Sequence, residues 1–223
     1  MYKYTFTTYT QHHLADRAVA SLPPGVEWEI VNTRPLKCLA EAWNTAIRTH
    51  LVDGDYDHLI ICNDDVTFEG DPVPQLISEL KGRVLISTAK DVDHPEWSGP
   101  TDYGFFCFCV DRRLPDLIGY FDEGFVHAGF EDADMITRIT LAGYEISISA
   151  PVHHIGSVTI KSNPRRWQKM FDQNFVRYCL KWGGVDGYER YMKPWNGMTE
   201  QEAVEDFLSG NEPEWMSDPY IGQ

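Results

Sequence analysis

The sequence lacks several features that would place a protein at a membrane or outside the cell. No window of about eighteen consecutive residues is apolar, so no membrane-spanning helix is predicted. The first residues, MYKYTFTTYT, lack the charged-then-apolar layout of a signal peptide. The 5 cysteines are an odd number and lie mostly in apolar runs, which favours reduced thiols over disulfides. We therefore expect a soluble, cytoplasmic protein.

The chain is also poor in basic residues. It has 19 Lys and Arg against 34 Asp and Glu, for a net charge of −15. Such a chain gains no general attraction to nucleic acid or anionic lipid, so a nucleic-acid partner is disfavoured. A local basic patch can still suffice for binding. The only candidate is residues 161–169, KSNPRRWQK, for which a solvated helix face is the favoured interpretation.

Length and periodicity predict one α/β domain with an appendage. The chain has 223 residues, 43% of them hydrophobic, which is enough for one sizeable core. Alternating and helical patterns predict strands at 2–9, 26–31, 59–62, 83–87, 104–110 and 145–149. They predict helices at 14–22, 39–47, 72–80, 115–119, 130–142, 164–182 and 200–208. This alternation predicts a largely parallel sheet with ligands at the carboxyl ends of its strands.

One predicted strand, residues 59–62, ends abruptly in Asn63-Asp64-Asp65. Adjacent carboxylates repel, so one of them is partly protonated unless a cation or a basic group is near. A divalent cation with oxygen ligands removes that conflict. A polar turn that ends the strand is the alternative, and this stretch alone supports both interpretations.

A second acidic cluster lies in the segment FDEGFVHAGFEDADM. It contains five carboxylates among aromatic residues and glycines: Asp122, Glu123, Glu131, Asp132 and Asp134. The last three begin a predicted helix, where the helix dipole favours negative charge. The dipole does not explain the apolar loop FVHAGF before them, which indicates a partly buried site. A carboxylate there could act as a general base toward a hydroxyl.

Two neighbouring histidines, His153 and His154, lie in the later segment APVHHIGS. They could include a metal ligand. Ordinary polar roles without a ligand are the favoured interpretation of this stretch taken alone.

Taken in order, these segments resemble the inverting glycosyltransferases of family 2, which have the GT-A fold of nucleotide-diphosphosugar transferases. The resemblance runs from Tyr4 to about Thr159 and rests on the order of the motifs rather than on any one of them. The matching segments are TY at 8–9, EIVN at 29–32, LAEAWNTAI at 39–47, IICNDDV at 60–66, IGYFDEGF at 118–125, FEDADMITR at 130–138 and VHHIGS at 152–157.

The resemblance implies a mixed, mostly parallel sheet flanked by helices. Residues 1–160 are the expected GT-A domain, with a nucleotide-binding half over 1–90 and an acceptor and catalytic half over 91–160. Residues 161–223 are expected to form a helical C-terminal extension packed on the same domain. Its aromatic stretches either receive the acceptor or close over the active site, and core packing is an equally supported alternative.

The resemblance also implies a metal-dependent donor site. Asp65 is expected to ligate Mn²⁺ or Mg²⁺ bound to the donor diphosphate, with His153 as a further ligand and His154 as the alternative. Asp64 is expected to assist, through the metal shell or the donor ribose. Asn63 occupies the first Asp position of the DxD-type motif, a neutral departure that would hold the metal more weakly. A UDP-sugar is the expected donor.

Four further residues are assigned to the donor by the same resemblance. Thr8 and Tyr9 correspond to the end of the first strand, which holds the nucleobase. Asn32 ends the second strand, where the family usually has Asp. Asn44 corresponds to the characteristic Asn of the following helix.

For catalysis, the resemblance makes Asp132 the general base that takes a proton from the acceptor hydroxyl. Glu131 is expected to orient the acceptor or the donor. One direct displacement inverts the anomeric centre, and no enzyme nucleophile is needed. The acceptor, whether a glycan, a protein or a modified nucleobase, is not identified by the sequence.

Two other functions compete with this prediction. A non-catalytic nucleotide-sugar or glycan-binding protein of the same fold would be marked by loss of the base or metal carboxylates, yet Asp65 and Asp132 are both present. A nucleotidyltransferase would normally carry a glycine-rich, basic phosphate loop near the first strand. The segment TTYTQHH is not such a loop.

Overall fold

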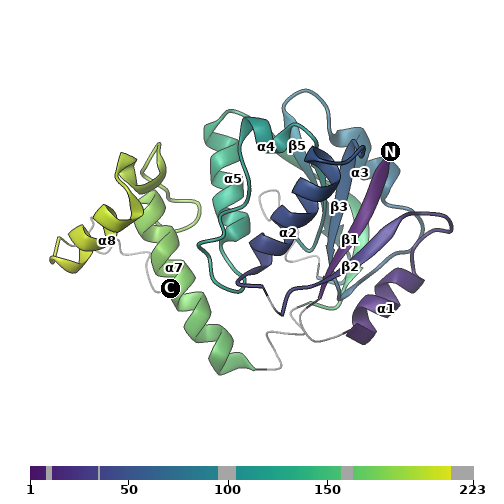
Figure 1. The fold of residues 1–223 in the computed structure, drawn as a ribbon, viewed down its shortest axis with the longest axis horizontal. Helices are drawn as coiled ribbons and strands as arrows, with labels where there is room; N and C mark the ends of the chain where they lie inside the picture. Colours follow the sequence, from purple (N-terminus) through teal and green to yellow (C-terminus); the bar gives the residue numbers. More distant parts are fainter. Residues whose placement is uncertain (9–11, 35, 95–103, 157–162, 212–223) are drawn as a thin grey trace.

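The sequence builds one sheet with helices on both faces (Figure 1). The computed structural model describes residues 1–8, 12–34, 36–94, 104–156 and 163–211. The strands within these ranges are β1 (Tyr2–Thr8), β2 (Trp28–Asn32), β3 (His58–Asn63), β4 (Val66–Thr67), β5 (Val84–Asp91), β6 (Cys107–Asp111) and β7 (Glu145–His154). Their order across the sheet is β2-β1-β3-β6-β5-β7-β4.

The helices lie close to the positions that the periodicity predicts. They are α1 (His12–Ala20), α2 (Leu39–Ile47), η1 (Arg48–Val52), α3 (Val73–Glu79), α4 (Leu114–Leu117), α5 (Glu131–Leu141), α7 (Pro164–Trp182), η3 (Pro194–Gly197) and α8 (Glu200–Leu208). Thr199 and Glu202 form a capping box at the start of α8. No helix in the described part of the chain is both long and apolar enough to cross a bilayer.

Most of the strands run in the same direction. β1 pairs in parallel with β2 and β3, and β5 pairs in parallel with β7. β6 runs antiparallel between β3 and β5, and β4 runs antiparallel at the edge beside β7. The carboxyl ends of β1, β2, β3, β5 and β7 therefore meet at one edge of the sheet, where ligands bind in open α/β sheets.

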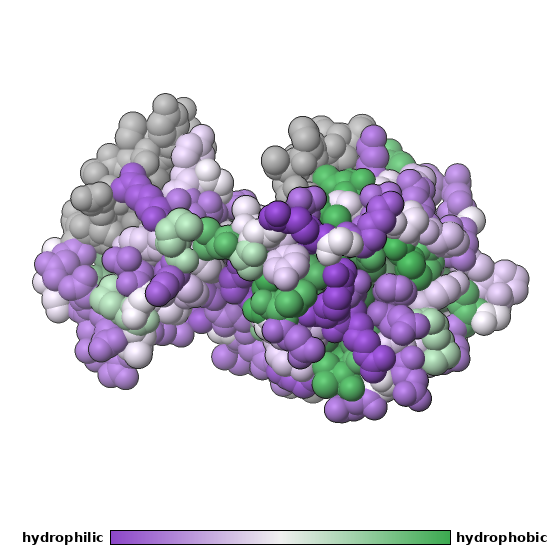
Figure 2. Space-filling view, turned by 90° about the horizontal axis from the view of Figure 1, so that it is seen from above, coloured by the Kyte–Doolittle hydropathy of each residue, from purple (hydrophilic) through white to green (hydrophobic). Residues whose placement is uncertain are grey.

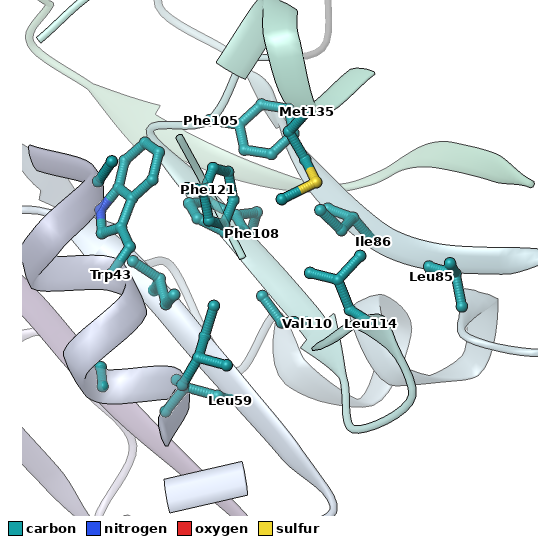
Figure 3. Close-up of a cluster of buried hydrophobic side chains, with 14 of the residues drawn as sticks. Trp43, Leu59, Leu85, Ile86, Phe105, Phe108, Val110, Leu114, Phe121 and Met135 are labelled. Carbon is teal, nitrogen blue, oxygen red and sulfur yellow. The ribbon is translucent and has the colours of Figure 1, made fainter. Parts of the chain in front are cut away.

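Both faces of the sheet are buried, as the apolar run in β3 predicts. Leu59 and Ile61 face a cluster with Trp43 of α2 and Met135 of α5, which Figure 3 shows. The alternating residues of β3 face a second cluster, to which α1 and α3 contribute. Because successive side chains on a strand point to opposite faces, one short run supplies both clusters. Cys107 and Cys109 share the second face, as their spacing predicts.

Strand β7 is longer than the sequence suggested. The alternation predicts a strand over 145–149, but β7 continues to His154. Its last two residues pair with β4, a two-residue strand that the sequence did not reveal. This pairing fixes the two histidines on a strand instead of in a loop.

The C-terminal helices form a lobe beside the sheet, joined to the body at a narrower waist (Figures 1 and 2). Helix α7 buries polar as well as apolar side chains against α5 and the loop before it. Lys181 Nζ lies 2.6 Å from Asp122 Oδ2 and 2.5 Å from Asp134 Oδ1. Trp182 Nε1 donates a hydrogen bond to Asp134 at 3.0 Å. These contacts join the lobe to the body through charges as well as through packing.

Asn174 of α7 holds the loop that precedes α5. Its side-chain oxygen accepts a hydrogen bond from Val126 N, and its amide nitrogen lies within 3.0–3.2 Å of the carbonyl oxygens of Val126, Ala128 and Gly129. Asn174 is 1% exposed. One buried amide thus satisfies backbone groups of a loop that lies outside the helices and the sheet.

We predict that Asn174→Ala lowers the free energy of unfolding by about 2–4 kcal/mol, because buried backbone groups lose their partners. Urea denaturation followed by circular dichroism measures the effect. The matched control is Gln173→Ala, an exposed neighbour on the same helix, which should change little. Equal stability of the two variants would show that the loop does not depend on this contact.

Candidate functional site

The carboxyl-end edge of the sheet gathers polar side chains from several strands. Thr8 ends β1, Asn32 ends β2, Asn63 ends β3 and His154 ends β7. The parallel register sets Thr8 beside Asn32 and Thr7 beside Asn63. Segments that are far apart in the sequence therefore share this edge.

Asp64 is buried and attached to the first strand. Thr8 Oγ1 donates a hydrogen bond to Asp64 Oδ2 at 2.5 Å. Burial raises the pKa of Asp64 to about 6, and the negative charge of Asp65 adds to this shift while the Thr8 hydroxyl opposes it. The electrostatic conflict expected from two adjacent carboxylates is therefore present in the folded chain.

Asp65 lies beside one ring nitrogen of His154, and the other ring nitrogen contacts a second carboxylate, that of Asp91. His154 Nε2 lies 3.4 Å from Asp65 Oδ1, and His154 Nδ1 lies 2.9 Å from Asp91 Oδ2. The imidazole stacks on Phe106 with ring centroids 4.4 Å apart. Burial would lower the pKa of His154, but the two carboxylates outweigh burial and raise it. Metal-binding histidines are commonly oriented in this way by a carboxylate on the second ring nitrogen.

His153, the ligand preferred from the sequence, is placed elsewhere. Its Nδ1 lies 3.0 Å from Asp93 Oδ1 and its Nε2 lies 3.3 Å from Glu69 Oε1. The hydrogen bond with Asp93 raises the pKa of His153. Because β7 continues through both histidines, their side chains face opposite sides of the strand. The alternative, His154, is the histidine that lies beside Asp65.

This edge of the sheet offers fewer protein ligands than a metal ion needs to complete its coordination shell. Among the described residues, no three His, Cys, Asp or Glu side chains gather as a ready-made metal site. Asp65 and His154 would supply two ligands. Mg²⁺ is commonly held by one or two protein carboxylates together with water and substrate phosphates, so two protein ligands suit a cation that binds together with a diphosphate.

The remaining donor candidates differ in their surroundings. Asn32 is exposed, and its Oδ1 accepts a hydrogen bond from Arg34 N at 2.9 Å. Asn63 is partly buried, and its backbone N–H donates to Phe106 O. Tyr9 lies outside the described residues.

Asn44 does not reach this edge of the sheet as a free side chain. It is fully buried, and its amide nitrogen donates at 2.8 Å both to Phe121 O and to Glu123 Oε1. Its Oδ1 accepts a hydrogen bond from Phe121 N at 2.9 Å. Both amide hydrogens are thus engaged, so Asn44 fastens α2 to the FDEG loop, and the donor contact expected of it stays a prediction.

The second acidic pair, Glu131 and Asp132, begins helix α5. Glu131 is 4% exposed, and its Oε2 has no hydrogen-bond partner. Burial, and then the charge of Asp132, raise the pKa of Glu131 to about 8. Asp132 is partly exposed and accepts a hydrogen bond from Ala133 N at 2.9 Å. Burial raises the pKa of Asp132 as well, while backbone N–H groups at the helix start oppose the shift.

These surroundings separate the two carboxyl groups chemically. Glu131 is the protonated partner at neutral pH and can donate a hydrogen bond. Asp132 is partly exposed, and its carboxylate can accept a proton when it is ionised. The helix leads through the turn at 142–144 into the start of β7, so its first residues lie toward the carboxyl-end edge of the sheet.

The other carboxylates of this cluster are held by partners that the sequence did not reveal. Lys181 and Arg177 lower the pKa of Asp122 below its usual range, against the effect of burial. Asp134 is fully buried, and Arg138 Nε donates to it at 2.9 Å. The i, i+4 spacing of Asp134 and Arg138 was visible in the sequence, but the contacts from α7 cross more than forty residues.

Solved glycosyltransferases share this fold. A mannosyltransferase from Pyrobaculum calidifontis, in complex with GDP-Man and Mn²⁺, aligns with a TM-score of 0.57 and 14% identity over 79% of this chain and 62% of its own. Glucosyl-3-phosphoglycerate synthase from Mycobacterium tuberculosis aligns with a TM-score of 0.54 and 11% identity over 81% of this chain and 77% of its own. The chain therefore has the GT-A glycosyltransferase fold, as expected from the sequence.

Sequence comparison gives distant relatives of the same kind. A putative polypeptide N-acetylgalactosaminyltransferase 9 of Drosophila melanogaster is 28% identical over 130 residues, which are 57% of this chain and 18% of that protein. Polypeptide N-acetylgalactosaminyltransferase 5 of Caenorhabditis elegans is 28% identical over 87 residues, 38% of this chain and 13% of that protein. The chain thus spans less than a fifth of these curated relatives. No family model matches it.

We predict that Glu131→Gln becomes progressively more stable than the wild type as pH rises from 5 to 9. The folded pKa of Glu131, about 8, exceeds its value in the unfolded chain, so folding opposes its ionisation and stability is lost as pH rises through that range. The difference in Tm between the variant and the wild type measures this. The control is Asp116→Asn, an exposed carboxyl on α4. A pH-independent difference would mean that Glu131 ionises normally.

Proposed function

We propose that this chain transfers a sugar from a nucleotide-diphosphosugar to an acceptor hydroxyl, with a divalent cation and with inversion of the anomeric centre. The observation that carries the proposal is the pairing of Asp65 with His154 at the sheet edge toward which Glu131 and Asp132 also lie. One group of side chains suits a diphosphate with its cation, and the other suits a hydroxyl that must lose a proton.

On the donor side, Asp65 and His154 Nε2 would hold the cation, Mn²⁺ or Mg²⁺. Asp91 keeps the imidazole in place through Nδ1 at 2.9 Å, and Phe106 covers one ring face. When bound, the cation offsets the charge that develops on the departing nucleoside diphosphate. Asp64, held by Thr8, would contact the ribose or the metal shell. A UDP-sugar is the proposed donor.

On the acceptor side, Asp132 would act as the general base. It is the more exposed member of its pair, and burial raises its pKa from the usual value of an Asp carboxyl toward neutral pH, where a general base works best. Glu131, protonated, would donate a hydrogen bond that orients a substrate oxygen. The acceptor oxygen attacks the anomeric carbon as the bond to the diphosphate oxygen breaks, and the proton goes to Asp132.

The ligands bound in related structures support a nucleotide sugar as the donor. The mannosyltransferase was determined with GDP-Man and Mn²⁺, and the phosphoglycerate synthase with UDP, Mn²⁺ and phosphoglyceric acid. A Drosophila β1,4-galactosyltransferase 7, with a TM-score of 0.51, 17% identity and coverage of 66% of this chain and 63% of its own, was determined with xylobiose. We also propose that residues 1–160 form the transferase domain and residues 161–223 an extension packed on it.

We predict that UDP with Mn²⁺ raises the Tm of the wild type and that Asp65→Ala and His154→Ala each abolish most of this rise, because each removes a proposed ligand. Differential scanning fluorimetry with and without Mn²⁺ measures it. His153→Ala is the matched control, since this neighbour faces Asp93 and Glu69. A larger loss in His153→Ala than in His154→Ala would reverse the assignment of the ligand.

We predict that Asp132→Asn retains the nucleotide-induced rise in Tm but lowers kcat for transfer by about 10²–10⁴-fold, the usual contribution of a general base. Mass spectrometry of reactions with a panel of nucleotide sugars detects transfer and hydrolysis. In the wild type, kcat should fall on the acid side as Asp132 is protonated, at a higher pH than for an ordinary Asp. Normal transfer by Asp132→Asn would exclude Asp132 as the base.

A further inference from the structure

Helix α7 carries a row of aromatic side chains toward the loop before α5. Trp167, Phe171 and Phe175 are spaced four residues apart, so they lie along one side of the helix. Two loop rings meet them. His127 lies 6.3 Å from Trp167, and Phe130 lies 4.9 Å from Phe171, between ring centroids. We refer to His127, Phe130, Trp167 and Phe171 as the aromatic ledge.

The ledge keeps an apolar ring open to solvent. Phe171 is 49% exposed, although Phe130 and Gly129 lie beside it. The Phe171 ring packs against the backbone of Gly129, which has no side chain. A Cβ added to Gly129 would lie 3.6 Å from this ring. By contrast, Tyr178 farther along the helix is fully buried. Within the row, Phe171 is exposed, while Trp167 and Phe175 are partly buried.

The surrounding backbone holds the ledge in one conformation. Asn174, which lies one turn beyond Phe171, binds the loop at Val126, Ala128 and Gly129. His127 and Phe130 have left-handed φ angles of 60° and 73°, which residues other than glycine seldom adopt. His127 N and O also pair with Lys37 O and Leu39 N. The rings are thus positioned before any ligand arrives.

The ledge is continuous with the proposed catalytic pair. Phe130 directly precedes Glu131, and its carbonyl accepts the hydrogen bond from Asp134 N in the first turn of α5. The unpartnered Oε2 of Glu131 lies at this junction. Burial, together with Arg166, lowers the pKa of His127, so its ring is neutral and offers one donor and one acceptor. A flat apolar surface therefore adjoins groups that bind hydroxyls.

We propose that the aromatic ledge is the acceptor subsite and that it binds a saccharide ring, with Phe171 as the stacking residue. This inference rests on the proposed transferase function. A sugar ring has an apolar C–H face, which suits an aromatic ring, and a rim of hydroxyls, which suits His127 and Glu131. The donor nucleotide belongs at the other end of the edge, beside Thr8 and Asp64.

Saturation-transfer NMR with methyl glycosides of the common hexoses and of xylose tests the ledge directly, with Mg²⁺ because Mn²⁺ broadens the resonances. The full chain should give saturation transfer from the protein to at least one glycoside. Phe171→Ala should abolish it, and Phe171→Tyr should retain it because the ring remains. Val176→Ala, a 40% exposed position on another side of α7, is the matched control and should behave as the wild type.

Kinetics add a second readout. With the nucleotide sugar that the chain hydrolyses or transfers, Phe171→Ala should raise the KM for the glycoside acceptor by about tenfold or more, equivalent to about 1.4 kcal/mol. The rate of donor hydrolysis without acceptor and the KM for the donor should not change. Loss of donor hydrolysis in this variant would instead indicate damage to the proposed donor site.

Three results would overturn the inference. One is equal saturation transfer in Phe171→Ala and the wild type. Another is saturation transfer to no glycoside at all. The third is enzymatic transfer of a sugar to Ser/Thr peptides and to no glycoside, which would assign the ledge to a peptide acceptor. A protein that binds glycosides at the ledge but neither binds nor hydrolyses any nucleotide sugar would refute the proposed function and not the saccharide site, since the NMR measurement needs no donor.

Discussion

The shared direction of five strands is the constraint on which the rest of this structure depends. Parallel pairing of β1 with β2 and β3, and of β5 with β7, brings strand ends that are up to about 140 residues apart to one edge. At this edge the antiparallel pairing of β4 with the end of β7 then sets His154 beside Asp65. The one reversed strand in the middle, β6, enters the sheet at this edge, so its start contributes Phe106 to the same place.

Two acidic pairs near this edge are made unequal by their surroundings. In the first, Asp64 is hydrogen-bonded to Thr8, while Asp65 faces an imidazole. In the second, Glu131 is buried with an unpartnered oxygen, while Asp132 remains partly exposed. Neighbouring carboxyl groups in different environments can take different tasks, such as binding a ligand, donating a hydrogen bond or accepting a proton.

Sequence patterns predicted the order of strands and helices along the chain, because hydrophobic periodicity and the Gly and Pro residues that end elements are local properties. The edge position of Asp64 and Asp65 followed from the same patterns. Which of His153 and His154 lies beside Asp65 did not follow, because it depends on how far β7 continues, and the pairing of β7 with β4 determines that. The partners of α7 were also hidden, since a Lys such as Lys181 in a helix reads as a surface residue until the buried carboxylates it meets are known.

The stacked imidazole has a consequence for the thermodynamics of binding. Asp91 fixes one nitrogen of His154 and Phe106 covers a ring face, so this side chain loses its rotational freedom when the chain folds. The cation proposed to bind here would not bear that entropic cost, so the two protein ligands would hold it more strongly than their number suggests. The cost instead lowers the folding stability of the free protein.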